Sequence, residues 1–569
     1  MTLTDWLVLL CTLGGVVGYG LWKGRASKRN MESYLLADRK LPWYHVTLSV
    51  MATQASAITF LSAPGQAYMD GMRFVQFYFG LPLAMIVISI TFIPLFKRLK
   101  VFTAYQFLEE RFDTKTRILT SFLFLIPRAL STGVTIAAPS IILTTILGWD
   151  LYWTNILTGS LVTLYCIFGG SKTISYTQLQ QMFVVLTGMF LAGYMCVHLL
   201  PNGMGLGDSL HVAGKMGKLN VLDWTFDLSN RYNVWSGLIG GFFLQLSYFG
   251  TDQSQVGRYL SGETVGEIRL GLLMNGILKI PMQFFILMVG ALVFVFYQFE
   301  QPPLFFNKTQ LEKIEQTPQY SDVQNRQTAV FTEKEKAVEG MVTALKSNDY
   351  AQVEAATKQV QDLNQQHEGL RKEVKDLMKK QDPKADVNDT NYVFLSFVTK
   401  HLPMGLVGLL IAVILLASMG SMASAFGSLT SCTAIDIYKR LINPNGSEHH
   451  YFAFSRWATL GWGIFCIIVA QFTANIGSLI EAVNILGSWF YGTILGVFLV
   501  AFYFKNVKGD AVFWAALLAE VIVIYCWYID LTAFLWLNLI GCVLVVVFAL
   551  FFNLFQKDKT LNSNVLDAK

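Results

Sequence analysis

Two apolar stretches of the sequence carry many hydroxyl side chains where a lipid-facing helix would carry Leu, Ile or Val. Residues 48–63 read LSVMATQASAITFLSA, and residues 415–436 read LLASMGSMASAFGSLTSCTAID. Polar backbone is tolerated inside a bilayer only where it is buried in protein or lines a cavity. A helix interrupted near Ala52–Ser56 would free carbonyl oxygens, which a hard cation such as Na⁺ prefers as ligands. The alternative is a closely packed helix whose hydroxyls bond back to its own chain.

An ionisable residue stands at the end of a third apolar stretch. Asp252 lies in SYFGTDQSQVGRYLSG, residues 247–262, after an apolar run that starts near Val234. A charged side chain within a span costs several kcal/mol unless it faces a partner or a cavity. Because Gly250 and Gly257 permit unwinding around it, Asp252 is a candidate functional residue. The alternative is that the span ends at Gly250 and Asp252 caps the segment that follows.

The composition indicates a polytopic membrane protein. Of the 569 residues, 53% are apolar and 14% are charged, whereas a soluble protein carries about 25% charged residues. The apolar residues gather into runs of about 20, the length that crosses a hydrocarbon core of roughly 30 Å. The net charge of +5 is mild, and we expect no nucleic-acid partner.

We predict an all-α polytopic membrane protein with about 13 transmembrane helices. The predicted limits are 5–22, 42–68, 73–96, 118–147, 150–169, 174–200, 233–255, 268–299, 395–435, 452–472, 477–504, 511–529 and 531–556. Loops rich in Lys and Arg, such as KRLKVF, IYKRLINPNG and the tail QKDK, alternate with loops poor in them, such as YMDGM. Basic loops favour the cytoplasm, so the N-terminus is predicted outside and the C-terminus inside.

Four regions follow from this pattern. Residues 1–299 hold spans 1–8, residues 300–394 form a polar insertion outside the membrane, residues 395–556 hold spans 9–13, and residues 557–569 form a cytoplasmic tail. The insertion carries apolar residues at helical spacing, and Ser347–Asn348–Asp349 has the composition of a break followed by a helix cap. We therefore predict a helical hairpin, interpreted as a surface or assembly element, with a substrate-binding role as the alternative.

The motifs resemble those of the sodium/solute symporter family over nearly all the spans, the insertion excluded. The resemblance rests on TDQSQVGRYL (251–260), on DIYKR (436–440) after the Ala/Ser-rich helix, and on NILGSWFYGTILGVFL (484–499). It implies a leucine-transporter-type fold with a five-plus-five inverted repeat, preceded by one span and followed by two. Spans 2–6 would pair with spans 7–11. Each repeat would then open with a broken helix, 42–68 and 233–255.

The resemblance also implies a sodium site. By motif position, its ligands fall on Ala52, Ala55, Ala417, Gly420 and Ser421. Many members of the family carry a hydroxyl residue where this chain has Gly420, so one ligand is missing unless Ser418 or water replaces it. Some members hold a second Na⁺ with an aspartate, and this chain has Gln178 at that position, within YTQLQQ. We therefore expect one Na⁺ per solute as the coupling ion.

Solute contacts are implied by similarity to bacterial sodium/galactose symporters. Lys279 in GILKIPM, Asp252 and Asn484 match contacting positions, and Thr59 and Tyr78 fall at two further ones. Thr59 and Tyr78, with Leu81, do not reproduce a galactose site. Lys279 has a structural alternative, in which it reaches the cytoplasmic interface.

Arg128, in FLIPRALSTG, is a further charge within a span. Sialic-acid members of the family place an arginine in this region, where a planar guanidinium suits a carboxylate. The alternative is a structural pairing of Arg128 with Asp252 or with a helix carbonyl end.

Together these features predict a Na⁺-coupled symporter of the inner or plasma membrane that imports a small organic solute by alternating access. The expected solute is a sugar or a sugar acid such as sialic acid, and no oligomer is required. The alternatives are an amino-acid or vitamin symporter of the same family and a membrane sensor that does not transport. We expect no enzymatic activity, because the seven histidines lie mainly in loops.

Overall fold

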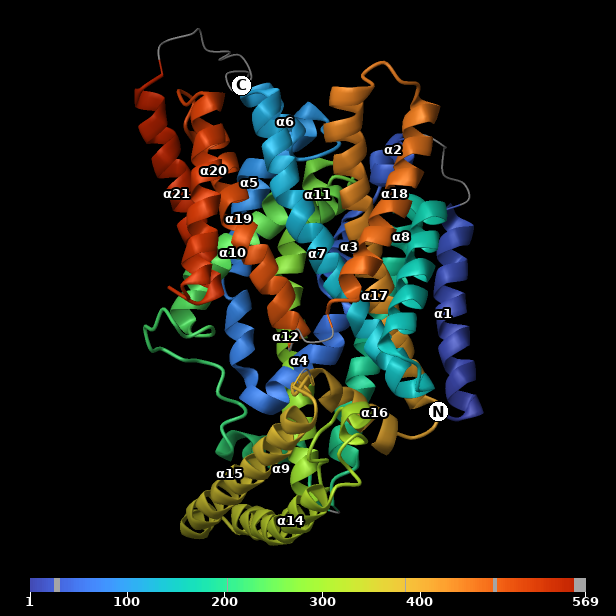
Figure 1. Cartoon of the computed structure of the whole chain (residues 1–569), viewed down its shortest axis with the longest axis vertical. Helices are drawn as coiled ribbons and strands as arrows, with labels where there is room; N and C mark the ends of the chain where they lie inside the picture. The colour runs from blue at the N-terminus through green and yellow to red at the C-terminus, as the bar shows by residue number, and fades with distance from the viewer. Residues whose placement is uncertain (25–30, 202, 384, 474–477, 557–569) are drawn as a thin grey trace.

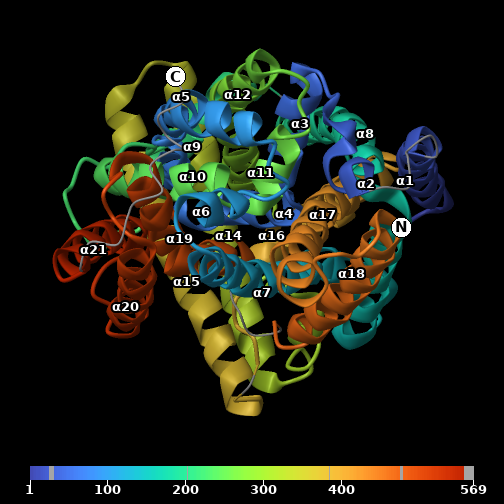
Figure 2. The same cartoon turned by 90° about the horizontal axis from the view of Figure 1, so that it is seen from above.

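The computed structural model describes residues 1–24, 31–201, 203–383, 385–473 and 478–556, and within these ranges it is a bundle of helices without strands. In Figure 1, α1 begins at the lower end of the bundle and α21 ends at the upper end. Seen from above, α1 and the pair α20 and α21 lie at opposite edges, and α4, α11 and α17 lie between them (Figure 2). The predicted tail, 557–569, lies outside the described residues.

Ten helices of the described chain are long and apolar enough to cross a membrane. They are α1 (Leu3–Gly24), η2 with α5 (Met72–Leu99), α7 (Thr114–Leu147), α8 (Leu151–His198), α12 (Val265–Phe299), α17 with η5 (Leu406–Ile442), α18 (Glu448–Ala470), α19 (Leu479–Tyr503), α20 (Gly509–Tyr528) and α21 (Phe534–Leu554). Shorter helices connect them: α2 (Met31–Leu36), η1 (Ala37–Arg39), α6 (Gln106–Arg111) and α9 (Leu206–Lys215).

Three further features account for the thirteen spans expected from the sequence. The pair α3 (Trp43–Gln54) and α4 (Ala57–Asp70) forms one span bent by 59°. The 48 residues of α8 pass through Gly170, whose φ of 64° and ψ of 179° are not helical, so this helix has the length and the break of two crossings. The third feature is a span in the middle of the chain, which consists of η3 (Ser236–Gly240), α10 (Gly241–Gly250) and α11 (Gln253–Tyr259).

One predicted span needs correction. The sequence predicted a continuous helix over 395–435, but the structure has a short helix α16 (Val393–His401) and starts α17 only at Leu406. Pro403 disfavours a helical conformation in the residue before it, and Gly405 has a φ of 85°, which ends the regular backbone. The helix then runs seven residues beyond the predicted end, as the π-helical segment η5 (Cys432–Ile442).

Both broken helices occur where the hydroxyl-rich and acidic stretches predicted them. The first helix stops at Ala55, and Ser56 is extended, with φ −78° and ψ 173°, before α4 begins. The second stops at Thr251, and the Asp252 carboxylate caps α11 by accepting from the Ser254 N–H at 2.8 Å. A helix end leaves its last carbonyls without partners in the same helix. Both breaks therefore expose polar backbone near the middle of the bundle.

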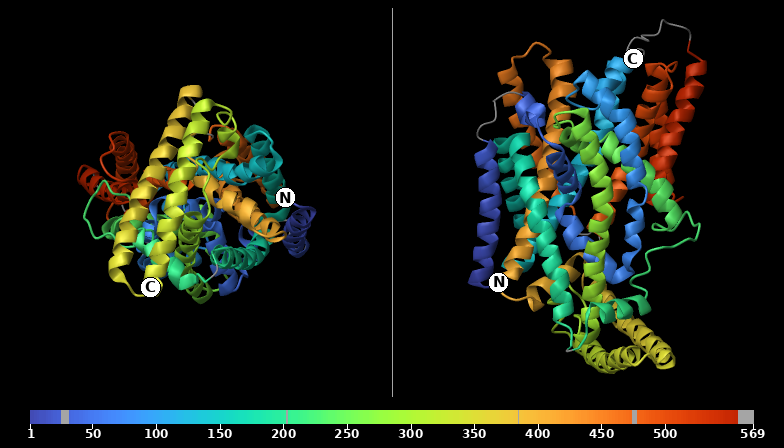
Figure 3. Two further views of the ribbon diagram at one scale, coloured as in Figure 1. Left: turned by 90° about the horizontal axis from the view of Figure 1, so that it is seen from below. Right: turned by 180° about the vertical axis from the view of Figure 1, so that it is seen from behind.

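The polar insertion forms the predicted hairpin. After α13 (Lys308–Leu311), α14 (Pro318–Lys346) and α15 (Tyr350–Gln381) pack along each other. Asn348 has a φ of 57°, and the Asp349 side chain accepts from the Gln352 N–H at 3.1 Å, which starts the second helix. Figure 3 shows this hairpin lying across the end of the bundle where α1 begins. The turn η4 (Thr390–Tyr392) then leads back to the membrane helices.

Candidate functional site

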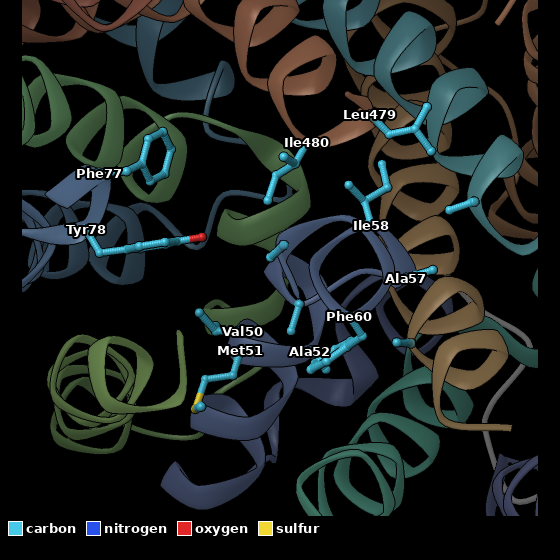
Figure 4. Packing of buried hydrophobic residues seen from close by; sticks show 14 of the residues in the cluster. Val50, Met51, Ala52, Ala57, Ile58, Phe60, Phe77, Tyr78, Leu479 and Ile480 are labelled. Atoms are coloured by element: carbon cyan, nitrogen blue, oxygen red, sulfur yellow. The ribbon is translucent and has the colours of Figure 1, made fainter. Parts of the chain in front are cut away.

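A cavity of about 110 Å³ lies beside the break between α3 and α4. Its walls come from the first broken helix, η2, α7, α10, α11, α17 and α19, so segments from both predicted repeats meet there. Five predicted site residues line it: Thr59, Tyr78, Arg128, Ser421 and Asn484. Figure 4 shows Phe77 and Tyr78 facing the two halves of the broken helix, which carry Ala52 and Ile58.

Most of the polar groups around this cavity are uncharged. Hydroxyl and amide side chains come from Thr53, Gln54, Ser56, Thr59, Ser131, Thr132, Thr135, Ser254, Ser421 and Asn484, and phenols come from Tyr78, Tyr248 and Tyr491. Such groups donate and accept hydrogen bonds without a net charge. The arrangement is therefore suited to a small polar molecule with several hydroxyl or amide groups.

Arg128 is the one charged side chain in the cavity wall of the described chain, and its charge is compensated. Its guanidinium forms an ion pair with Asp252 and donates to the Tyr491 hydroxyl at 2.8 Å. Tyr491 in turn donates to the same carboxylate oxygen of Asp252 at 2.9 Å. The structure thus shows the structural alternative for Arg128, in which this arginine pairs with Asp252. Asp252 lies behind Arg128 and Tyr491 and does not line the cavity.

Tyr491 was missed by the sequence interpretation. In the stretch NILGSWFYGT it is one aromatic residue among several. Its role depends on α7, α11 and α19 coming together, which no local pattern in the sequence indicates.

Lys279 also lies outside the cavity wall. It is fully buried on α12, and its ammonium nitrogen is 5.8 Å from the ring centre of Tyr78, which does face the cavity. Its nitrogen has no hydrogen-bond partner among the described residues. A cation over an aromatic ring is attracted by the ring's negative face. Lys279 can therefore act on a bound solute only through Tyr78 in this conformation.

The residues of the implied sodium site belong to α3 with its C-terminal end and to α17, two helices that the hydrogen bond between Thr53 and Ser424 joins. Ala55 is the residue at which α3 ends, and Ala52 lies one turn before it. On α17, the Ser421 hydroxyl donates to the carbonyl oxygens of Ala417 at 3.1 Å and Ser418 at 3.0 Å. Ser421 thereby keeps its own lone pairs available, and it lines the cavity. These carbonyl and hydroxyl oxygens are the ligand types that hard cations prefer.

Gln178 on α8 fills the position where a second cation would need an acidic ligand. Its amide nitrogen donates to the Gly420 carbonyl at 3.0 Å and the Ser424 hydroxyl at 2.9 Å, and lies 3.3 Å from the Thr53 hydroxyl. Its amide oxygen accepts from Ser49 at 2.5 Å. On α3, Ser49 and Thr53 therefore bond to α8 or α17, and the residues nearest the break, Thr53 and Gln54, line the cavity.

The comparisons with known proteins point to one family. A model described as the sodium:solute symporter family matches residues 34–307 and 381–519, which leaves out most of the hairpin. The chain is 31% identical to the human sodium/iodide cotransporter over 282 residues, which cover 49% of this chain and 43% of that relative. It is 26% identical to the sodium-dependent multivitamin transporter of Oryctolagus cuniculus over 512 residues, covering 88% and 67%. The match thus spans less than half the length of the sodium/iodide cotransporter.

Two further comparisons extend over nearly the whole chain. The sodium/glucose cotransporter of Vibrio parahaemolyticus is 24% identical over 521 residues, 90% of this chain and 82% of the relative. The solved substrate-bound outward-open state of a Na⁺-coupled sialic acid symporter superposes with a TM-score of 0.75 and 19% identity, covering 98% of each chain. This similarity confirms the predicted fold class. Because the family model matches well over half of its residues, the chain belongs to the sodium:solute symporter family.

Proposed function

We propose that the protein is a Na⁺-coupled symporter that imports a small polar solute by alternating access. The observation that carries the proposal is the cavity beside the break in the first repeat helix, with Ser421 and the carbonyl end of α3 on its wall. Broken helices whose ends face a midplane cavity are the usual construction of ion and substrate sites in secondary transporters. Na⁺ bound there would link α3 to α17, and the solute would occupy the adjoining polar volume.

One Na⁺ per solute is supported by the contacts of Gln178. Its amide nitrogen is directed at the oxygens of Gly420 and Ser424, which are ligand types for a cation. A donor group that occupies these oxygens competes with a cation for them. No anionic side chain replaces the aspartate that the family resemblance would require at this position. The proposed sodium ion is therefore the one held by Ala52, Ala55, Ala417 and Ser421.

A neutral sugar is the solute class that the cavity favours. Arg128 is paired with Asp252 and Tyr491, so the site offers no uncompensated cation to a carboxylate. The remaining polar lining consists of hydroxyls, amides and phenols. Aromatic side chains such as Tyr78 and Tyr248 can pack against the apolar face of a sugar ring while their hydroxyls hydrogen-bond.

A small organic acid is the second candidate. The Nε atom of Arg128 is buried and has no hydrogen-bond partner among the described residues, so this guanidinium keeps a donor in reserve. Relatives of the chain include a sodium-coupled monocarboxylate transporter of Xenopus laevis, which is 30% identical over 279 residues. Binding of an acid would require its carboxylate to share Arg128 with Asp252 or to displace it.

The charges of the loops support an orientation in a cell membrane in which α1 begins on the outer side and α21 ends on the cytoplasmic side. The two ends lie at opposite ends of the bundle, as an odd number of crossings requires (Figure 1). The basic loop that contains Lys97 and Lys100 lies at the end where α21 finishes, and the hairpin lies at the other end (Figures 1 and 3). Each chain contains its own complete cavity, so a monomer suffices for the proposed transport.

Solute binding to the purified protein tests the proposal. Neutral sugars, sugar acids, monocarboxylates and vitamins are titrated by calorimetry in NaCl and in choline chloride of equal ionic strength. The proposal predicts that at least one neutral sugar binds in NaCl and loses most of its affinity in choline chloride. Binding of the same solute with equal affinity in both salts would contradict sodium coupling. Binding of acids alone, with no neutral sugar bound, would make a small organic acid the first candidate solute in place of a neutral sugar.

A further inference from the structure

Gly420 on α17 has a neighbour that the motif comparison did not include. A Cβ atom added to Gly420 would overlap the side-chain amide oxygen of Gln181, which projects from α8. A side chain at position 420 and the Gln181 amide oxygen therefore cannot occupy the space beside α17 at the same time. In this chain the amide oxygen occupies that space. Gln181 is 2% exposed, so that space lies within the protein.

The amide oxygen of Gln181 has no hydrogen-bond donor among the described residues. A buried acceptor without a donor costs free energy, because its hydration is lost without replacement. The neighbouring Gln178, one turn earlier on α8, shows the opposite situation, since its amide oxygen and nitrogen are both bonded. The unsatisfied oxygen is thus a feature of Gln181 rather than of this region of α8. A positively charged ligand would satisfy it.

The position of this oxygen agrees with such a ligand. It adjoins Gly420, the residue directly before Ser421, and Ser421 lines the cavity. Amide carbonyl oxygens are common ligands of hard cations. A hydroxyl side chain at position 420 would have to occupy the same space.

We infer that the amide oxygen of Gln181 is a ligand of the coupling Na⁺ and supplies the oxygen that Gly420 lacks. The inference rests on the proposed function and adds a residue to its sodium site. It explains why Gly420 and a buried, unsatisfied glutamine occur together. Ser418, whose hydroxyl also has no partner among the described residues, is the competing source of the missing oxygen.

Direct binding of ²²Na⁺ to the purified full-length protein tests this inference without any solute. The substitution Gln181→Leu removes the oxygen and keeps a side chain of similar size. Loss of an oxygen ligand should raise the half-saturating Na⁺ concentration by roughly 5- to 150-fold. The matched control is Gln180→Leu, since Gln180 is the next residue along α8 and borders a hollow beside α1, away from the cavity. This control should bind Na⁺ as the wild type does.

A second substitution separates ligation from packing. In the Gln181→Leu background, Gly420→Ser should recover most of the lost Na⁺ affinity, because it places a hydroxyl where the amide oxygen was. If Gln181→Leu cannot be purified, Gln181→Glu places an anionic oxygen there and should bind Na⁺ at pH 8 more tightly than the wild type. A purely structural glutamine would show neither the recovery nor the tighter binding.

The outcomes are distinguishable. Wild-type Na⁺ affinity in folded Gln181→Leu would overturn the inference, as would a large loss in Ser418→Ala with none in Gln181→Leu. A wild-type protein that binds no ²²Na⁺ would contradict the proposed function itself rather than the choice of ligand.

Discussion

At the scale of single residues, the side chains around the cavity divide into those that bond one another and those that face the open volume. Thr53, which lines the cavity, bonds Ser424 at 2.8 Å and holds α3 against α17. Ser424 does not reach the cavity, whereas Ser421, one turn away on the same helix, lines it. The sequence alone does not distinguish hydroxyls that bond a neighbouring helix from hydroxyls that face the cavity. Only the relative rotation of the two helices decides which of them can reach an ion.

The substitution Ser421→Ala should weaken Na⁺ dependence more than folding. It removes one hydroxyl from the cavity wall, and the two carbonyls that this hydroxyl now contacts remain on the helix. Loss of a hydroxyl ligand to a cation should cost about 1–3 kcal/mol, which corresponds to roughly 5- to 150-fold in the half-saturating Na⁺ concentration. Uptake measured against Na⁺ concentration checks this. Unchanged dependence in a well-folded variant would place the ion elsewhere.

The substitution Arg128→Gln should lower the yield of folded protein, because it strands the buried carboxylate of Asp252. Breaking one side of a buried ion pair costs about 3–5 kcal/mol. The double variant Arg128→Gln with Asp252→Asn should recover part of that loss. Thermal unfolding of the three variants, with exposed Lys100→Gln as control, measures the coupling. Additive effects of the two substitutions would show that the pair contributes nothing beyond its separate residues.

Arg128 and Asp252 could each be predicted from the sequence as costly charges within spans. Their pairing was one of two open alternatives, since the residues are 124 positions apart. Tyr491 and Gln181 could not be predicted, because an aromatic or amide side chain in an apolar run has no special meaning until its neighbours are known. Site residues could therefore be predicted best where the residue type, such as a charged side chain, is unusual within a transmembrane span.

At the scale of elements, the hairpin is attached to the first broken helix more closely than its polar sequence indicates. Asp389, at its base, is fully buried and accepts from Arg371 on α15 at 2.9 and 3.0 Å and from the Phe306 N–H at 2.8 Å. The backbone of Thr390 packs so closely on α4 that a Cβ atom on Gly65 would overlap it. The base of the insertion thus contacts the second half of the broken helix.

Removal of the hairpin helices should be tolerated only if the charge at their base is also removed. Replacing residues 318–381 with a short flexible linker deletes Arg371 and leaves the Asp389 carboxylate without its cation. Combining the deletion with Asp389→Asn should restore membrane insertion and leave Na⁺-driven uptake measurable. Surface expression and uptake of both variants check this. Normal expression of the combined variant without any uptake would show that the hairpin takes part in transport.

The hairpin should also lose stability in acid. Burial, with Lys334 and Arg371 nearby, lowers the pKa of His367 to about 3 from the ordinary value of 6.5. The unfolded chain therefore takes up this proton near pH 6.5 and the folded one does not. The contribution of His367 is complete above pH 6.5 and decreases as the pH falls toward 3, by up to about 1.4 kcal/mol per pH unit.

Thermal unfolding between pH 7.5 and 5 measures this effect. His367→Gln keeps a neutral polar group beside Gln327 and should reduce the pH dependence. His211→Gln, an exposed position on α9, is the control and should leave it unchanged. An equal pH dependence in the wild type and His367→Gln would contradict a neutral buried histidine.

At the scale of the whole molecule, the two broken helices meet at one end of the bundle. The Leu41 N–H donates to the Ser261 carbonyl at 3.0 Å, and the Glu263 N–H donates to the Leu41 carbonyl at 3.2 Å. The start of the first broken helix therefore lies beside the end of the second, as an inverted repeat requires. The span count and both breaks could be predicted from runs of apolar and small residues. The division at Pro403 was missed because long apolar runs flank it on both sides, although Lys400 and His401 interrupt them just before it, and hydropathy does not detect a change of direction.

Uptake into proteoliposomes tests the central claim, which is that a Na⁺ gradient drives solute through this cavity. The solute found by calorimetry is supplied outside in NaCl or in choline chloride, with wild-type protein and Ser421→Ala. The account predicts accumulation above equilibrium only with an inward Na⁺ gradient, a Hill coefficient for Na⁺ near one, and a higher Na⁺ requirement in Ser421→Ala. Equal uptake by the wild type in choline chloride would contradict it.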